Sequence, residues 1–193
     1  MKVILGITGA SGAIYGVEML RGLVVHGVDV DLIVSPVAEK VFQDERGENA
    51  RSAVARVLRE TGTKVTVQTW DYDDFAAGPA SGSYQHDGML IVPCSMATVG
   101  RIASGTAPNL ICRAADVCLK ERRKLILGVR ETPLSAIHLR NLAALSEAGA
   151  LVAPASPAFY GRPQTIEDLV RAFCGRLLDA LGIPNDWAPR WLE

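Results

Sequence analysis

Short apolar stretches alternate with longer stretches of helical periodicity along almost the whole chain. Lys2–Ile7 predicts a strand, and residues 13–26 predict a helix because apolar residues recur there at intervals of three and four. Further strands are expected at 28–34, 64–69, 89–92, 125–129 and 150–153. Further helices are expected at 36 to about 60, with a break near Gly47, and at 95–103, 109–122, 135–148 and 165–181. This alternation predicts an α/β fold with a mostly parallel sheet that helices cover on both faces.

One stretch, residues 71–87, shows neither period. It contains two glycines, a proline and two serines, which predicts a loop. The chain has no internal repeat, no low-complexity segment and no visible domain boundary. Residues 1–193 are therefore expected to form a single domain.

The residues that directly follow the strands are the candidates for ligand binding. Ligands of open α/β sheets bind at the carboxyl ends of the strands, where the strand order reverses. In this chain those ends carry residues 8–12, Ser35, 93–98, 130–133 and 154–163. The glycine-containing loop over 8–12 lacks the G-x-G-x-x-G spacing of dinucleotide sites, and Ser35 stands where such a site usually has an acidic residue. Both features favour a mononucleotide, whose phosphate can bind at a helix N-terminus.

Polar residues at two strand ends have both a structural and a functional interpretation. Ser95 can cap the helix that follows it, or its hydroxyl can bind a ligand. Arg130 can bind a phosphate with its guanidinium, or it can pair with Glu131 inside the loop. The sequence leaves both interpretations open for each residue.

Two further cations lie on predicted helices. Lys120 shares one helical face with Arg113 and Asp116, and Asp116 can form an exposed ion pair with Lys120 four residues later. Arg176 lies at the edge of the apolar stripe of the last helix, where it can extend into solvent or point across a subunit interface. After the last strand, residues 158–163 add two aromatic rings and a cation.

Composition limits the classes of function. Hydrophobic residues make up 49% of the 193 residues and the net charge is -1, so we expect a packed core and no general attraction to nucleic acid or to a membrane surface. No apolar run reaches the roughly 20 residues of a membrane span, and we expect a cytoplasmic protein. The four cysteines form no C-x-x-C pair and are expected to be buried small hydrophobic residues, without a metal site.

A set of motifs over nearly the whole chain resembles the flavin prenyltransferases, the UbiX-type family that serves UbiD-type decarboxylases. The matching segments are T-G-A-S-G at 8–12, A-S-G-S at 80–83, P-C-S at 93–95, N-L-I-x-R-A-A-D-V-x-L-K-E-R-R at 109–123, R-E-x-P at 130–133, F-Y-x-x-P-Q-x-x-E-D-L-V at 159–170 and I-P-x-D-x-x-P-R-W at 183–191. The resemblance implies a single-domain, Rossmann-like flavoprotein fold, a three-layer sandwich whose tail from about residue 183 packs near the site.

The resemblance also implies the reaction and the residues that bind its reactants. A dimethylallyl group passes from dimethylallyl phosphate, or the diphosphate, to N5 and C6 of reduced FMN without a metal, and prenylated FMN then serves a UbiD-type decarboxylase. The residues that match the family's FMN site are Gly9, Ala10, Ser11, Ser35, Ser95, Met96, Ala97, Thr98 and Arg130. Those that match its donor site are Lys120, Arg130, Tyr160, Arg176 and Trp191.

Four residues match catalytic positions of the family. Ser11 corresponds to the residue nearest the flavin, and Lys120 to a cation at the leaving phosphate. Glu45 and Glu131 match acids that the family uses around proton transfer. Family members assemble as dodecamers of trimers with sites at subunit boundaries, so this chain is expected to form a homododecamer.

Two other functions remain as alternatives. One is an FMN-dependent cysteine decarboxylase of related fold, although neither its P-x-M-N-x-x-M-W substrate loop nor its early histidine is seen in this chain. The other is a non-catalytic FMN carrier, which would not need Lys120, Tyr160 and Arg176 together.

Overall fold

The computed structural model describes residues 1–190 and shows, within them, one sheet of six parallel strands in the order β3-β2-β1-β4-β5-β6. The strands are β1 (Lys2–Ile7), β2 (Asp29–Val34), β3 (Val67–Trp70), β4 (Gly88–Cys94), β5 (Leu125–Val129) and β6 (Leu151–Pro154). The helices are α1 (Ala13–Val25), α2 (Pro36–Arg46), α3 (Ala50–Thr61), α4 (Met96–Ala103), α5 (Leu110–Lys120), α6 (Ala136–Glu147) and α7 (Ile166–Leu181). This strand order is that of Rossmann-like folds.

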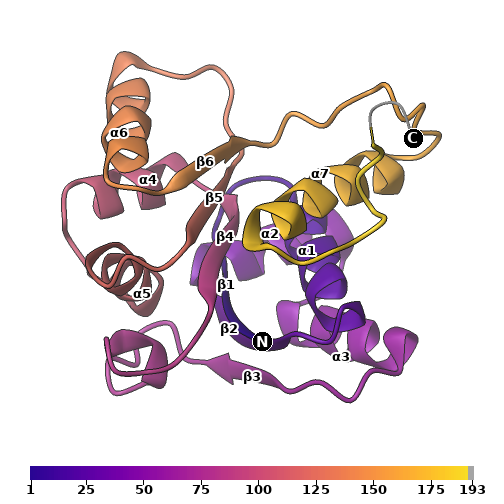
Figure 1. Ribbon diagram of the computed structural model, residues 1–193, viewed down its shortest axis with the longest axis horizontal. Coiled ribbons are helices and arrows are strands. Elements are labelled where there is room, and N and C mark those ends of the chain that lie inside the picture. Colours follow the sequence, from indigo (N-terminus) through magenta and orange to yellow (C-terminus); the bar gives the residue numbers. More distant parts are fainter. Residues whose placement is uncertain (191–193) are drawn as a thin grey trace.

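The helices form a layer on each face of the sheet (Figure 1). One face packs against α1, α2, α3 and α7, and the other packs against α4, α5 and α6. The strands β4 and β5 are buried along their whole length, and their sequences are mostly apolar. Such strands are typical of a parallel sheet that is covered on both sides. The α/β fold predicted from the sequence, a single-domain three-layer sandwich, is confirmed.

Ordinary capping chemistry sets the boundaries of the helices on the first face. The predicted break in the helix over 36–60 occurs at Gly47, whose φ of 64° ends α2 in the left-handed conformation. Asn49 then starts α3, because its side chain accepts a hydrogen bond from the Ser52 amide at 2.8 Å. Within residues 1–190, no helix is long and apolar enough to cross a bilayer.

The strand β3 starts later than the alternating pattern predicts. The pattern indicated a strand over 64–69, but pairing with β2 begins at Val67, opposite Val30. Asp29 holds the preceding residue instead, because its carboxylate accepts a hydrogen bond from the Thr66 amide at 2.7 Å. This side-chain contact competes with a regular ladder, so the strand is shorter at its start.

All four cysteines are buried, as predicted from their spacing; they are Cys94, Cys112, Cys118 and Cys174. Burial raises the pKa of the Cys118 thiol to about 12, although the positive charge of Arg123 opposes the shift. The thiol is therefore neutral near pH 7 and packs as a small apolar group.

The tail after α7 packs back onto that helix and reaches the segment after β6. Asp179 on α7 pairs with Arg190 at 2.7 Å. The Tyr160 hydroxyl donates a hydrogen bond to the Pro189 carbonyl oxygen at 2.9 Å. Tyr160 and the tail are thus held together, whereas Trp191, the tail aromatic expected at the donor site, lies outside the described residues.

Truncation of Leu90 tests the packing at the centre of the sheet. Leu90 lies in β4 with 0% of its surface exposed, so Leu90→Ala is expected to lower the free energy of unfolding by about 2–5 kcal/mol. The control Val25→Ala, at the exposed end of α1, is expected to change it by about 0.5 kcal/mol or less. Urea unfolding at one fixed protein concentration measures both, and an equally small effect of the two substitutions would contradict the core described above.

Candidate functional site

The carboxyl ends of β1 and β4 meet where the strand order reverses, because β1 pairs with β2 on one side and with β4 on the other. Thr8 follows β1, and its amide and hydroxyl both donate hydrogen bonds to the Pro93 carbonyl oxygen, at 3.2 and 2.9 Å. Its hydroxyl oxygen also accepts a hydrogen bond from the Ser95 amide at 2.8 Å. Thr8 therefore fixes the loops over 8–12 and 93–98 to each other.

The loop over 8–12 passes so close to two helices that it needs its glycines. Gly12 has a φ of 108°, in the left-handed region, and a Cβ there would lie 2.8 Å from the Tyr15 ring. A Cβ at Gly9 would overlap with the side chain of Val37 in the first turn of α2. The glycines thus bring the loop backbone between the starts of α1 and α2.

Glu45, near the end of α2, binds the N-terminus of α1. Its carboxylate accepts hydrogen bonds from the amides of Gly12 at 3.0 Å and Ala13 at 2.8 Å, and another from the Ser11 hydroxyl. The amides of residues 9–11 have no acceptor among the described residues. Three successive unpaired amides beside a helix N-terminus are suited to an anionic or hydrogen-bonding ligand.

The carboxyl group of Glu45 is ionised at neutral pH. Burial acts to raise its pKa, but hydrogen bonds from Ser11 and from the first amides of α1, together with the Arg130 charge, outweigh that effect. The pKa of Glu45 therefore lies below its ordinary value of 4.5. In this state the side chain is an acceptor of protons and hydrogen bonds.

A cavity of about 330 Å³ opens between the ends of β1, β2 and β4. Ser35 and Ser95 lie in its wall, where they cap α2 and α4 through hydrogen bonds from the Ala38 amide at 3.1 Å and the Thr98 amide at 3.4 Å. The capping interpretation of Ser95 is confirmed, and each hydroxyl retains capacity to bind a ligand. The lining residues are Thr8, Gly9, Ser35, Pro36, Val37, Tyr72, Ser95, Ala97, Thr98 and Arg101.

Arg130 follows β5 and lies beside the glycine loop, since a Cβ at Gly12 would be 3.9 Å from its Cδ. Its Nε is buried and has no hydrogen-bond partner among residues 1–190. Glu131 accepts a hydrogen bond from the Thr132 amide at 3.1 Å, and the salt bridge considered for Arg130 and Glu131 is not formed within the described residues. A buried donor without an acceptor is costly, so this nitrogen is placed for a ligand.

A second cavity, of about 310 Å³, lies at the ends of β5 and β6. Arg130 and Glu131 are in its wall, which also contains the backbone that leads from β6 toward Tyr160. Since Arg130 also adjoins the glycine loop, it links this cavity to the first site. The remaining lining residues are Val129, Thr132, Leu134, Leu142, Pro154, Ala155 and Ser156.

Lys120 and Arg176 lie on helices that cover opposite faces of the sheet, and each pairs with a carboxylate of its own segment. Lys120 ends α5 and pairs with Glu121, whereas Arg176 lies on α7 across the sheet, 65% exposed, and pairs with Asp179 at 3.0 Å. Lys120 precedes β5 and Arg130 follows it, so the length of this strand, about 3.3 Å for each residue, separates them by roughly 17 Å. One chain alone does not bring the predicted cations together.

The ion pair that spacing allowed between Asp116 and Lys120 is not formed among the described residues. Asp116 pairs with Arg113 at 2.8 Å, and Lys120 pairs with the next residue, Glu121. The long guanidinium of Arg113 reaches the carboxylate from three residues earlier on the same helical face. Lys120 is at the helix end, where a neighbouring carboxylate is equally accessible.

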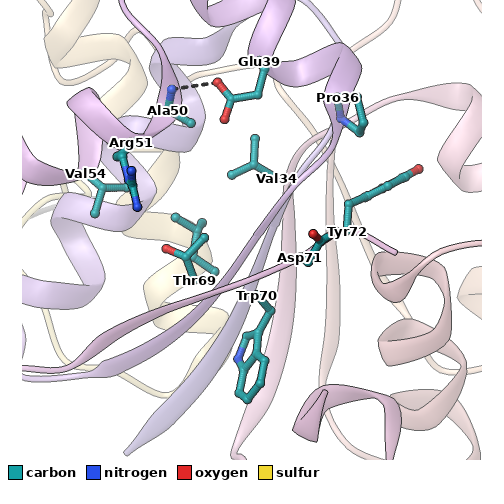
Figure 2. Close-up of a pocket in the computed structure, with 11 residues that line it drawn as sticks. Val34, Pro36, Glu39, Ala50, Arg51, Val54, Thr69, Trp70, Asp71 and Tyr72 are labelled. Atoms are coloured by element: carbon teal, nitrogen blue, oxygen red, sulfur yellow. Dashed lines mark hydrogen bonds between the residues drawn. The ribbon is translucent and has the colours of Figure 1, made fainter. Parts of the chain in front are cut away.

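A larger cavity, of about 530 Å³, lies at the β3 edge of the sheet (Figure 2). Apolar side chains such as Val34 and Val54 form much of its wall, and Arg51 is a charged member. The carboxylate of Glu39 is already used, because it accepts a hydrogen bond from the Ala50 amide at 2.9 Å, drawn as a dashed line in Figure 2. None of the site residues predicted from the sequence lines this cavity, so its size does not make it the candidate site.

Four residues that line the first cavity were not predicted from the sequence: Pro36 and Val37, which directly follow Ser35, and the larger polar residues Tyr72 and Arg101. Arg101 lies three residues after Thr98 on α4, so helical spacing was the available signal. Tyr72 lies in the stretch over 71–87, which has no pattern, and only the folded structure brings it to the strand ends.

The fold and these contacts define a class of protein: a three-layer α/β protein with an anion-binding site at the switch point of its sheet. The amides of residues 9–11, the hydroxyls of Ser35 and Ser95 and the guanidinium of Arg130 together fit a phosphate-containing mononucleotide such as FMN. No cluster of three potential metal ligands is found within residues 1–190.

Comparisons with known proteins agree with this class. Residues 1–178 match the family model described as Flavoprotein. The chain is 44% identical over 191 residues to flavin prenyltransferase UbiX of Thermoplasma acidophilum, with 99% of this chain and 100% of the relative covered. It is similar to the crystal structure of AnUbiX (PadA1) in complex with FMN and dimethylallyl pyrophosphate, with 40% identity, a TM-score of 0.91 and coverage of 100% of this chain and 97% of that one.

A second solved structure is a dodecameric FMN-dependent UbiX-like decarboxylase from Escherichia coli O157:H7, with 42% identity, a TM-score of 0.90 and full coverage of both chains. Identity at this level over whole chains, in the same fold, is sufficient to assign the family. The chain belongs to the flavoprotein family and, within it, to the UbiX-type flavin prenyltransferases.

The lowered pKa of Glu45 predicts a pH dependence of stability. A carboxyl group whose pKa falls on folding contributes stability above its unfolded pKa and loses that contribution as the pH falls through its folded pKa. Thermal unfolding of the wild type and Glu45→Gln should therefore show a stability difference near pH 7 that shrinks below the ordinary value of 4.5. Gln43→Ala, an exposed change on the same helix, controls for general acid effects. A difference that stays constant with pH would refute the proposed ionised cap.

Proposed function

We propose that this protein transfers a dimethylallyl group from dimethylallyl phosphate, or the diphosphate, to N5 and C6 of reduced FMN, and so makes prenylated FMN. The observation that carries the proposal is the buried, unpartnered Nε of Arg130 beside the unpaired amides of residues 9–11. These groups offer hydrogen bonds and positive charge at the switch point of the sheet. The reaction class is that of the relatives, which are flavin prenyltransferases.

FMN would be held at the strand ends by Gly9, Ala10, Ser11, Ser35, Ser95, Met96, Ala97, Thr98 and Arg130. When bound in its reduced form, FMN supplies the nucleophile of the reaction. Ser35 and Thr98 are buried, so the hydrogen bonds that they offer a ligand are shielded from competing water. Thr8 joins the two loops and keeps these groups in a fixed arrangement.

Ser11 and Glu45 would control protons and orientation beside the ligand. The Ser11 hydroxyl donates a hydrogen bond to the Glu45 carboxylate, which leaves the Ser11 oxygen as an acceptor toward the ligand. Glu45 is ionised, so it can take up a proton that the reaction releases. One carboxylate oxygen of Glu131 accepts a hydrogen bond from the Thr132 amide, and the other oxygen can accept a proton.

The donor phosphate would be bound by Lys120, Arg130, Tyr160 and Arg176, with Trp191 beside the prenyl group. When the carbon–oxygen bond of the donor breaks, the phosphate leaves with the electron pair, and fixed cations stabilise its growing charge. These cations provide the charge neutralisation that a metal ion supplies to the leaving phosphate in other enzymes, so we propose a metal-independent reaction.

Assembly would bring these cations to one site. Lys120 and Arg176 lie on opposite faces of the sheet and away from Arg130 in a single chain, and both are accessible to a neighbouring copy. We propose that the chain forms a homododecamer and that a site takes Arg130 from one subunit and Lys120 from another. The product would pass to a UbiD-type decarboxylase in the cytoplasm.

The reaction predicts a change in the mass of the flavin. Incubation without oxygen of the protein, pre-reduced FMN and dimethylallyl phosphate should yield flavin that is heavier by one dimethylallyl group, and Arg130→Gln should yield far less. Unchanged flavin that stays bound would favour the non-catalytic carrier. Loss of carbon dioxide from a cysteinyl peptide would favour the cysteine decarboxylase, and either result would contradict the proposal.

Mixed oligomers test whether Lys120 and Arg130 come from different subunits. Removal of a cation that stabilises leaving-group charge should raise the barrier by about 2.7–4 kcal/mol, by analogy with a lost oxyanion donor, so Lys120→Ala and Arg130→Ala are each expected to lose roughly a hundredfold or more in single-turnover rate. If the two variants are unfolded and refolded together, random mixing should restore about a quarter of the sites.

The matched control mixes Lys120→Ala with the double variant Lys120→Ala/Arg130→Ala, which can rebuild no site. Recovery in the first mixture alone supports the shared site. No recovery in mixtures whose exchange is verified by native mass spectrometry would contradict it.

A further inference from the structure

Arg101 is the one charged residue among the described residues that line the cavity between the ends of β1, β2 and β4. It lies on α4, one turn after Ala97 and Thr98, which line the same cavity. It is outside every motif that carries the family resemblance, and the proposed function does not use it. Its guanidinium has no hydrogen-bond or ion-pair partner among residues 1–190.

The other groups in this wall are suited to an anion. The amides of Met96 and Ala97 begin α4 and have no acceptor among the described residues. The hydroxyls of Ser35, Ser95 and Thr98 lie in the same wall, and no carboxylate of residues 1–190 lines the cavity. Arg101 therefore adds a full positive charge to a set of neutral donors.

Arg101 is an exposed side chain that lies in the cavity wall together with Tyr72. Burial raises the pKa of the Tyr72 hydroxyl, and the charges of nearby groups, Arg101 among them, modify that shift. Because the guanidinium of Arg101 is exposed at this wall, it is accessible to an anion that enters the cavity from solvent.

The two arginines of the site adjoin different cavities. Arg130 lines the cavity at the carboxyl ends of β5 and β6. Arg101 lines the cavity at the carboxyl ends of β1, β2 and β4. The reaction of the proposed function has two phosphates, one on the flavin and one that leaves with the donor. A separate cation at each cavity would keep the two apart.

We propose that Arg101 binds the phosphate of FMN in the cavity beside α4 and that this contact makes the protein select FMN over riboflavin. The inference rests on the proposed function, because it assumes that a flavin occupies the site. A phosphate monoester carries about 1.5 to 2 negative charges at pH 7, whereas riboflavin ends in a neutral hydroxyl. The arginine should thus affect the affinity for one flavin and not for the other.

Flavin binding to Arg101→Gln, measured by fluorescence titration, tests this assignment. The affinity for FMN should fall roughly tenfold or more, which is about 1.4 kcal/mol, while the affinity for riboflavin changes less than about twofold. Arg101→Lys keeps the charge and should recover part of the loss. Arg51→Gln is the matched control, because Arg51 is an exposed arginine in the wall of the neighbouring cavity. It should change neither affinity.

Two results would overturn the proposal: an FMN affinity within about twofold of the wild type, or equal losses for FMN and riboflavin, which would mean that Arg101 only shapes the cavity. Phosphorus NMR of bound FMN provides a second readout. The resonance should shift in Arg101→Gln and stay in place in Arg51→Gln, and an unshifted signal in both would also contradict the contact. These measurements need no prenyl transfer, so failure of the reaction and failure of this assignment are distinguishable.

Discussion

The contact between Glu45 and the start of α1 is the one on which the site depends. The carboxylate binds the first amides of the helix and the Ser11 hydroxyl, and so it takes the place that a ligand phosphate occupies at many helix N-termini. The amides of residues 9–11 are consequently left for the ligand. Because Gly12 has a positive φ, the chain turns sharply there. The amides of Gly12 and Ala13 can therefore face Glu45 while those of residues 9–11 stay free for a ligand.

The parallel sheet explains why donors and cations come from segments far apart in the sequence. All carboxyl ends of its strands lie at one edge, and the strand order reverses between β1 and β4, so loops over 8–12, 93–98 and 130–133 converge there. The same geometry sends the end of α5 to the opposite edge. Lys120 is therefore remote from Arg130 in its own chain, and the proposed assembly of several copies would bring the two together.

Local chemistry made much of the fold predictable. The limits of β1 and β5 match the apolar runs, and Gly47 ends its helix where the pattern indicated. Ser95 was a candidate cap from its position before a helix, and it is one. The late start of β3 was not predictable, because it depends on the Asp29 side chain, whose partner lies 37 residues away.

The site was predictable only as far as each residue had a local signal. The glycine loop and Arg130 follow strands, and their positions alone point to ligand binding. The partner of Asp116 depended on which of two cations had the better reach, which spacing does not decide. Tyr72 joins the wall from a loop without periodicity, and the proposed pairing of Lys120 with another subunit's Arg130 would depend on the assembly rather than on local sequence.

We expect FMN to bind at the switch point with its phosphate at the start of α4. An experimental structure of the assembled protein with FMN tests this most directly. The phosphate should lie between Ser95, Thr98 and Arg101, with Lys120 of a neighbouring copy near Arg130. A flavin bound instead in the larger cavity beside β3, or a site whose Lys120 and Arg130 belong to one chain, would contradict it.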